Sequence, residues 1–352
     1  MKQLSATVIF CLLFINCIIG QTNKVTELPD ISVIGHYGTT YSDSTKSFEI
    51  EELEFAFQHY LYPSIKVDIF TALHKNDSGL FEYELEEGYL TFANLFEVLL
   101  PNSTRNFGIG AILGKKFLNV GKINQLHPEQ IDFANRSIVS KQFFGSDHNL
   151  AGEGGSLNYL LPLSFYSQFE VGAYQAIAEE SGATHSNVEY ENKIITSRLW
   201  NSFELNNQNE LELGLNIVLG NATASAESDQ QQLMGLDITL QRDLSNQRSL
   251  KLQSEIYQAN YGEDGEARET QSGYFASAVY KHNQYFNAGL RYAFLGTHGD
   301  EGSEKTEIAL MLTRQLTETT KFRFQYSTGE GVEDTFYAKL MFGMGPHSHV
   351  LQ

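Results

Sequence analysis

The sequence predicts an all-β fold, a transmembrane antiparallel β-barrel of about 16 strands with short periplasmic turns, longer extracellular loops and a long third loop. Three observations lead to this prediction. Apolar and polar residues alternate with a period of two, short turns alternate with longer polar loops, and the chain is rich in glycine, tyrosine and phenylalanine.

Composition and charge exclude several other classes of protein. The chain has 352 residues, with 24 Lys and Arg against 43 Asp and Glu, so the formal charge is -19. The mean hydropathy is -0.27, and no uninterrupted apolar run of about 18 residues follows the N-terminal segment. A helical multispanning membrane protein is therefore excluded. We expect no nucleic-acid partner, because phosphate binding needs a cationic face.

The first 20 residues have the pattern of a secretory signal peptide. Lys2 precedes an apolar stretch at residues 6–19, and Gly20 provides a small residue before the expected cleavage point. A lipoprotein anchored at Cys17 is the alternative, although Phe-Ile-Asn before this cysteine lacks the small residue that such cleavage prefers. Both cysteines of the chain lie in this segment, so the predicted mature chain has no disulfide.

The expected domain organisation is simple. Residues 1–20 are the signal peptide, residues 21–30 a short periplasmic N-terminal segment, and residues 31–352 the barrel. An exported chain of this composition is expected in the outer membrane of a Gram-negative-type bacterium, with outer-membrane lipid as a partner.

The alternation of side chains is clearest at residues 210–217. One face of this segment is apolar and the other is polar: Leu211, Leu213, Leu215 and Ile217 against Glu210, Glu212, Gly214 and Asn216. The same split recurs at residues 52–58, 65–74, 234–241 and 321–326. We interpret the apolar face as the one toward lipid and the polar face as the one toward water. The strands of a soluble β-sandwich would alternate in the same way. The lengths of the connections between strands therefore have to distinguish a barrel from a sandwich.

Short turns alternate with longer polar loops along the chain, which is typical of an outer-membrane barrel. Tight connections lie at residues 62–64, 162–164, 206–208, 245–247, 282–283 and 318–319. The predicted strands are residues 31–40, 49–61, 65–75, 81–93, 105–117, 154–162, 167–178, 190–204, 209–219, 231–243, 249–260, 270–282, 285–296, 305–317, 320–328 and 335–344.

The third long loop, between the predicted strands that end at Phe117 and begin at Gly154, has about 36 residues. It contains Phe133, Phe143 and Phe144, which a purely solvated loop would not need. We expect the loop to fold inward against the lumen wall, because a barrel of this size leaves a bore that an inserted segment can narrow. An extracellular cap is the alternative.

Several short segments resemble a porin-like family of bacterial outer-membrane proteins whose members are often labelled zinc-regulated, TonB-dependent outer-membrane receptors. The segments are Leu-Pro-Asp-Ile-Ser-Val-Ile-Gly at 28–35, Ala-Phe-Gln-His-Tyr-Leu-Tyr-Pro at 56–63, Tyr-Glu-Leu-Glu-Glu-Gly-Tyr-Leu-Thr-Phe at 83–92, Gly-Lys-Ile-Asn-Gln-Leu-His-Pro at 121–128, Phe-Phe-Gly at 143–145 and Phe-Gly-Met-Gly-Pro-His at 342–347. The resemblance implies a porin-like barrel and a link to zinc. The chain departs from the family in having Glu129 and Gln130 after His127-Pro128, where relatives show a second histidine.

TonB coupling is not expected, because a TonB-dependent receptor has a separate N-terminal plug and only about ten residues lie between Gln21, the first residue after the expected cleavage point, and the first predicted strand. No cofactor is expected either. The candidate metal ligands are His127, Glu129 and His148 in the third loop and His347 and His349 after the last strand. For His127 the alternative is a hydrogen bond within the loop, and for the last pair a frayed terminus.

Charged residues provide the remaining site candidates. Glu82, Glu84 and Glu86 alternate along one predicted strand and are expected to form an acidic lumen wall that favours cations, with a solvated rim as the alternative. A pore constriction is predicted at Lys115, Lys122, His127, Glu129, Arg136 and Lys141. Arg136 and Lys141 could equally anchor the third loop through salt bridges.

The sequence thus predicts a channel for passive diffusion of small hydrophilic solutes or ions, with a preference for cations, and it leaves a homo-oligomer open. A zinc-linked uptake receptor, a structural barrel and an outer-membrane hydrolase are the alternatives. No enzyme is expected, because the chain has no Gly-x-Ser-x-Gly motif and a barrel of about 16 strands implies an open bore.

Overall fold

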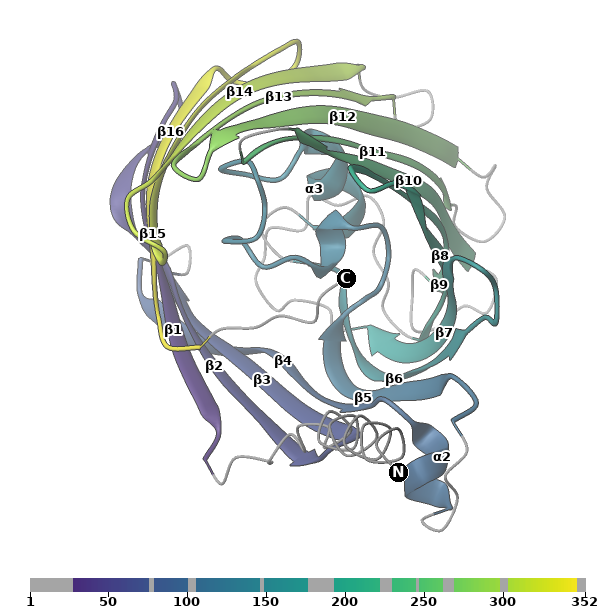
Figure 1. Ribbon diagram of the computed structural model, residues 1–352. Coiled ribbons are helices and arrows are strands. Elements are labelled where there is room, and N and C mark those ends of the chain that lie inside the picture. Colours follow the sequence, from purple (N-terminus) through teal and green to yellow (C-terminus); the bar gives the residue numbers. More distant parts are fainter. Residues whose placement is uncertain are drawn as a thin grey trace, which may run out of the picture.

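The computed structural model describes residues 28–75, 79–100, 106–145, 149–176, 193–221, 230–244, 247–261, 269–297 and 303–346. Within these residues, sixteen antiparallel strands form one closed barrel in which β1 pairs with β16 and every other strand pairs with its neighbours in sequence. Figure 1 shows the barrel along its axis. Each strand of the closed sheet therefore has a hydrogen-bonded neighbour on both sides, and no strand is left at an open edge.

The strand bounds confirm all sixteen predicted strands. They are β1 Asp30–Tyr41, β2 Lys46–Tyr62, β3 Ile65–Lys75, β4 Phe81–Phe92, β5 Ile109–Phe117, β6 Ala151–Leu160, β7 Tyr166–Ala176, β8 Lys193–Asn206, β9 Asn209–Asn221, β10 Gln230–Leu244, β11 Arg248–Tyr261, β12 Glu269–Asn283, β13 Phe286–Leu295, β14 Lys305–Gln315, β15 Thr320–Thr328 and β16 Thr335–Met344. The largest shift is at β5, which begins at Ile109 rather than at residue 105.

One rim of the barrel carries the short turns, with a single exception. The connection between β4 and β5 contains the helix α2, Leu95–Leu99, which the sequence did not predict. Among the described residues no helix is long and apolar enough to cross a membrane.

The outer wall is apolar, as predicted from the alternation. Leu215 on β9 is 54% exposed, and Phe324 on β15 is 40% exposed. Their neighbours Asn216 and Gln325 point inward and are nearly inaccessible. Exposed leucine and phenylalanine around a closed sheet are the surface that lipid requires.

Five strand pairings contain a register shift, and two of these shifts change which glutamates face inward. The pairing of β1 with β2 skips Glu51, and the pairing of β3 with β4 skips Glu86. A bulge sets two consecutive residues against one on the neighbouring strand. At these two places, adjacent glutamates can therefore share the inner face.

The third loop of the longer-loop rim, called loop 3 here, runs from residue 118 to residue 150 and folds into the barrel, as predicted. It contains the short helices η1, Ile123–Gln125, and α3, Ile138–Phe144. The Ser137 hydroxyl caps α3 by accepting a hydrogen bond from the Ser140 backbone N–H. Figure 1 shows α3 inside the ring of strands, beside β10 to β13.

Loop 3 forms an apolar core with the inner wall of the barrel. The loop contributes Leu118, Val120, Val139 and Phe143. The wall contributes inward apolar side chains from β7 to β13, namely Tyr174, Ile194, Val218, Leu233, Tyr257, Ala259, Phe275, Ala293 and Leu295. The interpretation of the inner face as uniformly water-facing is wrong here, because the loop removes this part of the wall from water.

Candidate functional site

An acidic wall lines the inner face of β2 and β4. Strand register places its carboxylates inward, because His36 is directly opposite Glu52 and Phe70 is directly opposite Glu87. The acidic wall consists of Glu49, Glu51, Glu52 and Glu54 on β2 and of Glu82, Glu84, Glu86 and Glu87 on β4. The three glutamates that the sequence assigned to one face therefore share it with five others.

Some carboxylates of the acidic wall are paired with cations. Glu49 lies 2.7 Å from the Lys75 ammonium, and Glu51 lies 2.6 Å from that of Lys339 on β16.

The pairing of Glu84 places Lys115, one of the residues assigned to the constriction. Lys115 Nζ is 3.5 Å from the Glu84 carboxylate and also donates to the Leu85 carbonyl. Lys115 therefore lies against the acidic wall.

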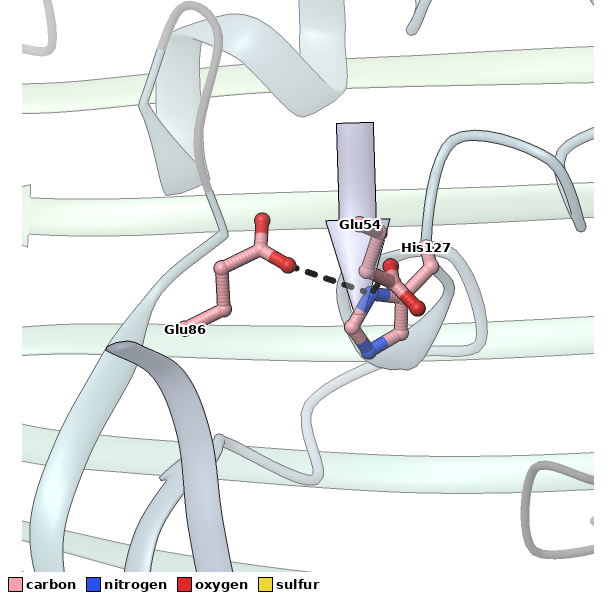
Figure 2. Close-up of side chains that lie close together, drawn as sticks. All are labelled: Glu54, Glu86 and His127. Atoms are coloured by element: carbon pink, nitrogen blue, oxygen red, sulfur yellow. Dashed lines mark ion pairs between the residues drawn. The ribbon is translucent and has the colours of Figure 1, made fainter. Parts of the chain in front are cut away.

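His127 connects loop 3 to the acidic wall. Its Nδ1 atom lies 2.7 Å from a Glu54 oxygen and 3.7 Å from a Glu86 oxygen, and its Nε2 atom lies 3.0 Å from a Glu87 oxygen. Figure 2 shows Glu54 and Glu86 directed at the same side of the ring. All three of these carboxylates belong to the wall, while the His127 backbone N–H donates to the Gln130 side chain within the loop.

The surroundings of His127 explain its charge. The side chain is inaccessible to solvent, with the rings of Phe70 and Phe117 each centred 4.9 Å from the imidazole. Burial lowers the pKa of His127, but the carboxylates of Glu54, Glu87 and Glu86 raise it by more, so the pKa lies well above its ordinary value. At neutral pH the ring is therefore an imidazolium that pairs with the wall.

A second contact attaches loop 3 to β8–β11. The Gly121 N–H donates to Asn216, and the Gly121 carbonyl accepts from Arg198. The Lys122 and Ile123 N–H groups both donate to Glu255. The expectation that Asn216 faces water is wrong, because loop 3 covers it.

Lys122 adds an ion pair to this second contact. Its ammonium pairs with Glu212, and burial lowers the pKa of Lys122 to about 8. It is thus an attachment point between the loop and the wall.

A third contact attaches loop 3 to β13–β16. Arg323 donates to the carbonyls of Ile131 and Phe133, at 2.6 and 2.8 Å. Arg291 donates to the Asn135 carbonyl and forms a buried ion pair with Glu307 at 2.6 Å. Loop 3 therefore touches three separate arcs of the inner wall, and it crosses the lumen between them.

The other predicted site residues occupy different places. Glu129 lies 4.0 Å from His36 on β1, and its backbone carbonyl accepts from Lys321. Arg136 donates to the Leu126 carbonyl and to Asn149, both within loop 3, and Lys141 is in the last turn of α3. His148, His347 and His349 lie outside the described residues.

The structure brings together residues that the sequence left apart. The sequence placed His127 in the constriction and Glu86 in the acidic lumen wall, as two separate sites. It did not indicate Glu54 or Glu87 as partners of His127. The bulge at Glu86 explains part of this, since strict alternation would turn Glu87 outward. No pattern in the sequence indicated Glu54 as the partner of a loop residue 73 positions away.

A closed sixteen-strand barrel with a long loop folded into its lumen is the architecture of the outer-membrane porins. No family model matches the chain. A curated protein of Aquifex aeolicus (strain VF5), described as an uncharacterized protein, is 22% identical over 348 residues, which cover 87% of this chain and 70% of that protein.

Two solved structures share the fold. Salmonella typhi OmpF, in complex with daunomycin, superposes with a TM-score of 0.60 at 10% identity, covering 90% of this chain and 97% of OmpF. An anion-selective porin from Comamonas acidovorans superposes with a TM-score of 0.57 at 10% identity, covering 90% of this chain and all of that porin. At these identities the likeness shows the fold alone, and it gives no support to the zinc-regulated, TonB-dependent label.

Proposed function

We propose that the chain is an outer-membrane channel for passive diffusion of small hydrophilic solutes or ions, with a preference for cations. The single observation that carries this proposal is the position of loop 3, which crosses the lumen of a closed barrel beside an acidic wall. A water-filled path bounded by charge needs no cofactor or covalent step.

The preference for cations rests on the acidic wall. Ion pairs with Lys75, Lys115, His127 and Lys339 are found on the described part of this wall, which has eight glutamates. Excess negative charge in a confined aqueous path lowers the electrostatic barrier for cations. A porin of similar fold is anion-selective, so the barrel fold alone does not determine which ions are preferred. We therefore base the preference for cations on the charged side chains that line the lumen.

Planar-bilayer recording of the refolded chain tests the proposal. The expected result is stepwise conductance, with a reversal potential in a KCl gradient that indicates excess K⁺ permeation. Absence of conductance from a correctly folded barrel would favour the structural barrel. Conductance steps with a reversal potential of the opposite sign would support a channel but contradict the preference for cations.

We place the barrel in the outer membrane, with its apolar outer wall against lipid. A homo-oligomer stays a prediction, which cross-linking of the refolded barrel in detergent would test.

A further inference from the structure

We propose that Glu54, Glu86 and the Nδ1 atom of His127 form a binding site for one divalent transition-metal ion, where loop 3 meets the acidic wall. The three ligand atoms lie within 4.8 Å of one another and come from β2, β4 and loop 3. Figure 2 shows the two carboxylates converging on Nδ1. The site does not rest on the proposed channel function, because it concerns binding to the folded barrel.

The orientation of the imidazole is an argument separate from the clustering of acids. A histidine that ligates a metal donates its other ring N–H to a carboxylate, which fixes the tautomer and directs the free nitrogen at the ion. Here Nε2 lies 3.0 Å from Glu87, and Glu87 is itself held by the Phe117 N–H at 2.8 Å. Nδ1 is thereby directed at Glu54 and Glu86.

The distances suit a small ion after modest side-chain movement. Zinc binds nitrogen and oxygen at about 2.0–2.2 Å, so two ligands of a tetrahedral ion lie about 3.3 Å apart. The 2.7 Å contact of Nδ1 with Glu54 would lengthen, and the 3.7 Å contact with Glu86 would shorten. The apolar rings of Phe70 and Phe117 beside the imidazole restrict access of water.

The ligand set selects the class of metal. One imidazole nitrogen with two carboxylates suits zinc and other first-row divalent metals, whereas Ca²⁺ and Mg²⁺ take oxygen ligands. Three protein ligands leave a fourth position for water or a solute donor.

The experiment is a calorimetric titration of the refolded full chain with ZnCl₂ at pH 7 in excess Mg²⁺. His347→Asn and His349→Asn are introduced first, to remove the C-terminal histidine pair as a competing chelator. One Zn²⁺ per chain should bind. Glu86→Gln should weaken binding at least tenfold, Glu87→Gln should weaken it about 10–100-fold, and the matched control Glu84→Gln, on the same strand and face, should leave it unchanged.

Three results would overturn the proposal: no binding at millimolar Zn²⁺, equal losses from Glu86→Gln and Glu84→Gln, or displacement of Zn²⁺ by Mg²⁺. The last two would indicate diffuse binding to the acidic wall. Folding of each variant is checked by its shift on gels without boiling. Should Glu86→Gln fail to fold, the Co²⁺ absorption spectrum of the chain with its histidine pair removed decides. Bands of four-coordinate Co²⁺ support the site, and the spectrum of the aqueous ion contradicts it.

Discussion

Replacing Gly121 with alanine should detach loop 3 from β8–β11. Gly121 has φ +64°, and a Cβ there would lie 1.8 Å from the Tyr257 hydroxyl and 2.9 Å from a Glu255 oxygen. Both neighbours are fully buried, so neither can withdraw without moving the wall or the loop. The Gly121 backbone bonds to Asn216 and Arg198 would be lost with the displacement.

The magnitude follows from two contributions. The left-handed conformation costs alanine about 1–2 kcal/mol relative to glycine. A displaced loop also breaks the hydrogen bonds of Glu255 and Arg198 to the loop backbone, while Tyr257 still donates to Glu255 and Arg198 still pairs with Asp237. The lost hydrogen bonds should cost about 1–3 kcal/mol in all. The two contributions together give an expected loss in free energy of unfolding of about 2–5 kcal/mol.

Gly79→Ala is the matched control. Gly79 has φ +74°, but no atom lies within 4 Å of a Cβ built there, so only the backbone strain of about 1–2 kcal/mol applies. Denaturant unfolding of both variants in lipid vesicles, followed by fluorescence of the single tryptophan, Trp200, measures the difference. Equal losses in the two variants would refute the argument that loop 3 is fixed to the wall at Gly121.

Three further predictions concern the wall. Leu215→Arg, on the lipid face, should destabilise the barrel by about 2–4 kcal/mol near the bilayer midplane. An unchanged unfolding midpoint would show that Leu215 does not face lipid. Arg291→Met should lower the free energy of unfolding by about 3–5 kcal/mol, because it leaves Glu307 as a buried, unpaired charge. The double variant Arg291→Met with Glu307→Leu should regain most of this free energy, and a double variant as unstable as Arg291→Met would contradict the ion-pair account. The double variant Glu82→Gln with Glu84→Gln should shift the reversal potential toward zero at low salt. The shift should be smaller at about 1 M salt, where the screening length is about 3 Å. No shift at low salt would favour the solvated-rim alternative.

The fold could be predicted because its main determinant is local. Lipid outside and protein or water inside impose a period of two on every strand, and the turns between strands are visible as polar interruptions. All sixteen strands follow from this pattern. The ends of the strands are predicted less accurately than their presence. The predicted strand at 105–117 begins only at Ile109, after a connection that contains α2.

The candidate site was predicted only in part, because it depends on register. Alternation assigned Glu82, Glu84 and Glu86 to one face. It could not reveal the bulges at Glu51 and Glu86, which change the inward face by one residue and are not marked by glycine or proline.

The long-range partners of loop 3 could not be predicted at all. The phenylalanines indicated that the loop is packed, which is correct for Phe133, Phe143 and Phe144. Nothing local links His127 to Glu54 or Gly121 to Asn216, because these pairs meet only after the barrel closes and the loop folds back into it.

The most direct test of the account compares the single-channel conductance of the unmodified chain with that of a variant in which residues 125–144 are replaced by a short Gly-Ser linker. The replaced segment contains His127, α3 and the contacts with Arg291 and Arg323, while the barrel wall keeps its own hydrogen bonds. The account predicts larger conductance steps in the variant, together with lower stability from the exposed apolar inner wall. Equal conductance in the two proteins would contradict the claim that loop 3 narrows the path.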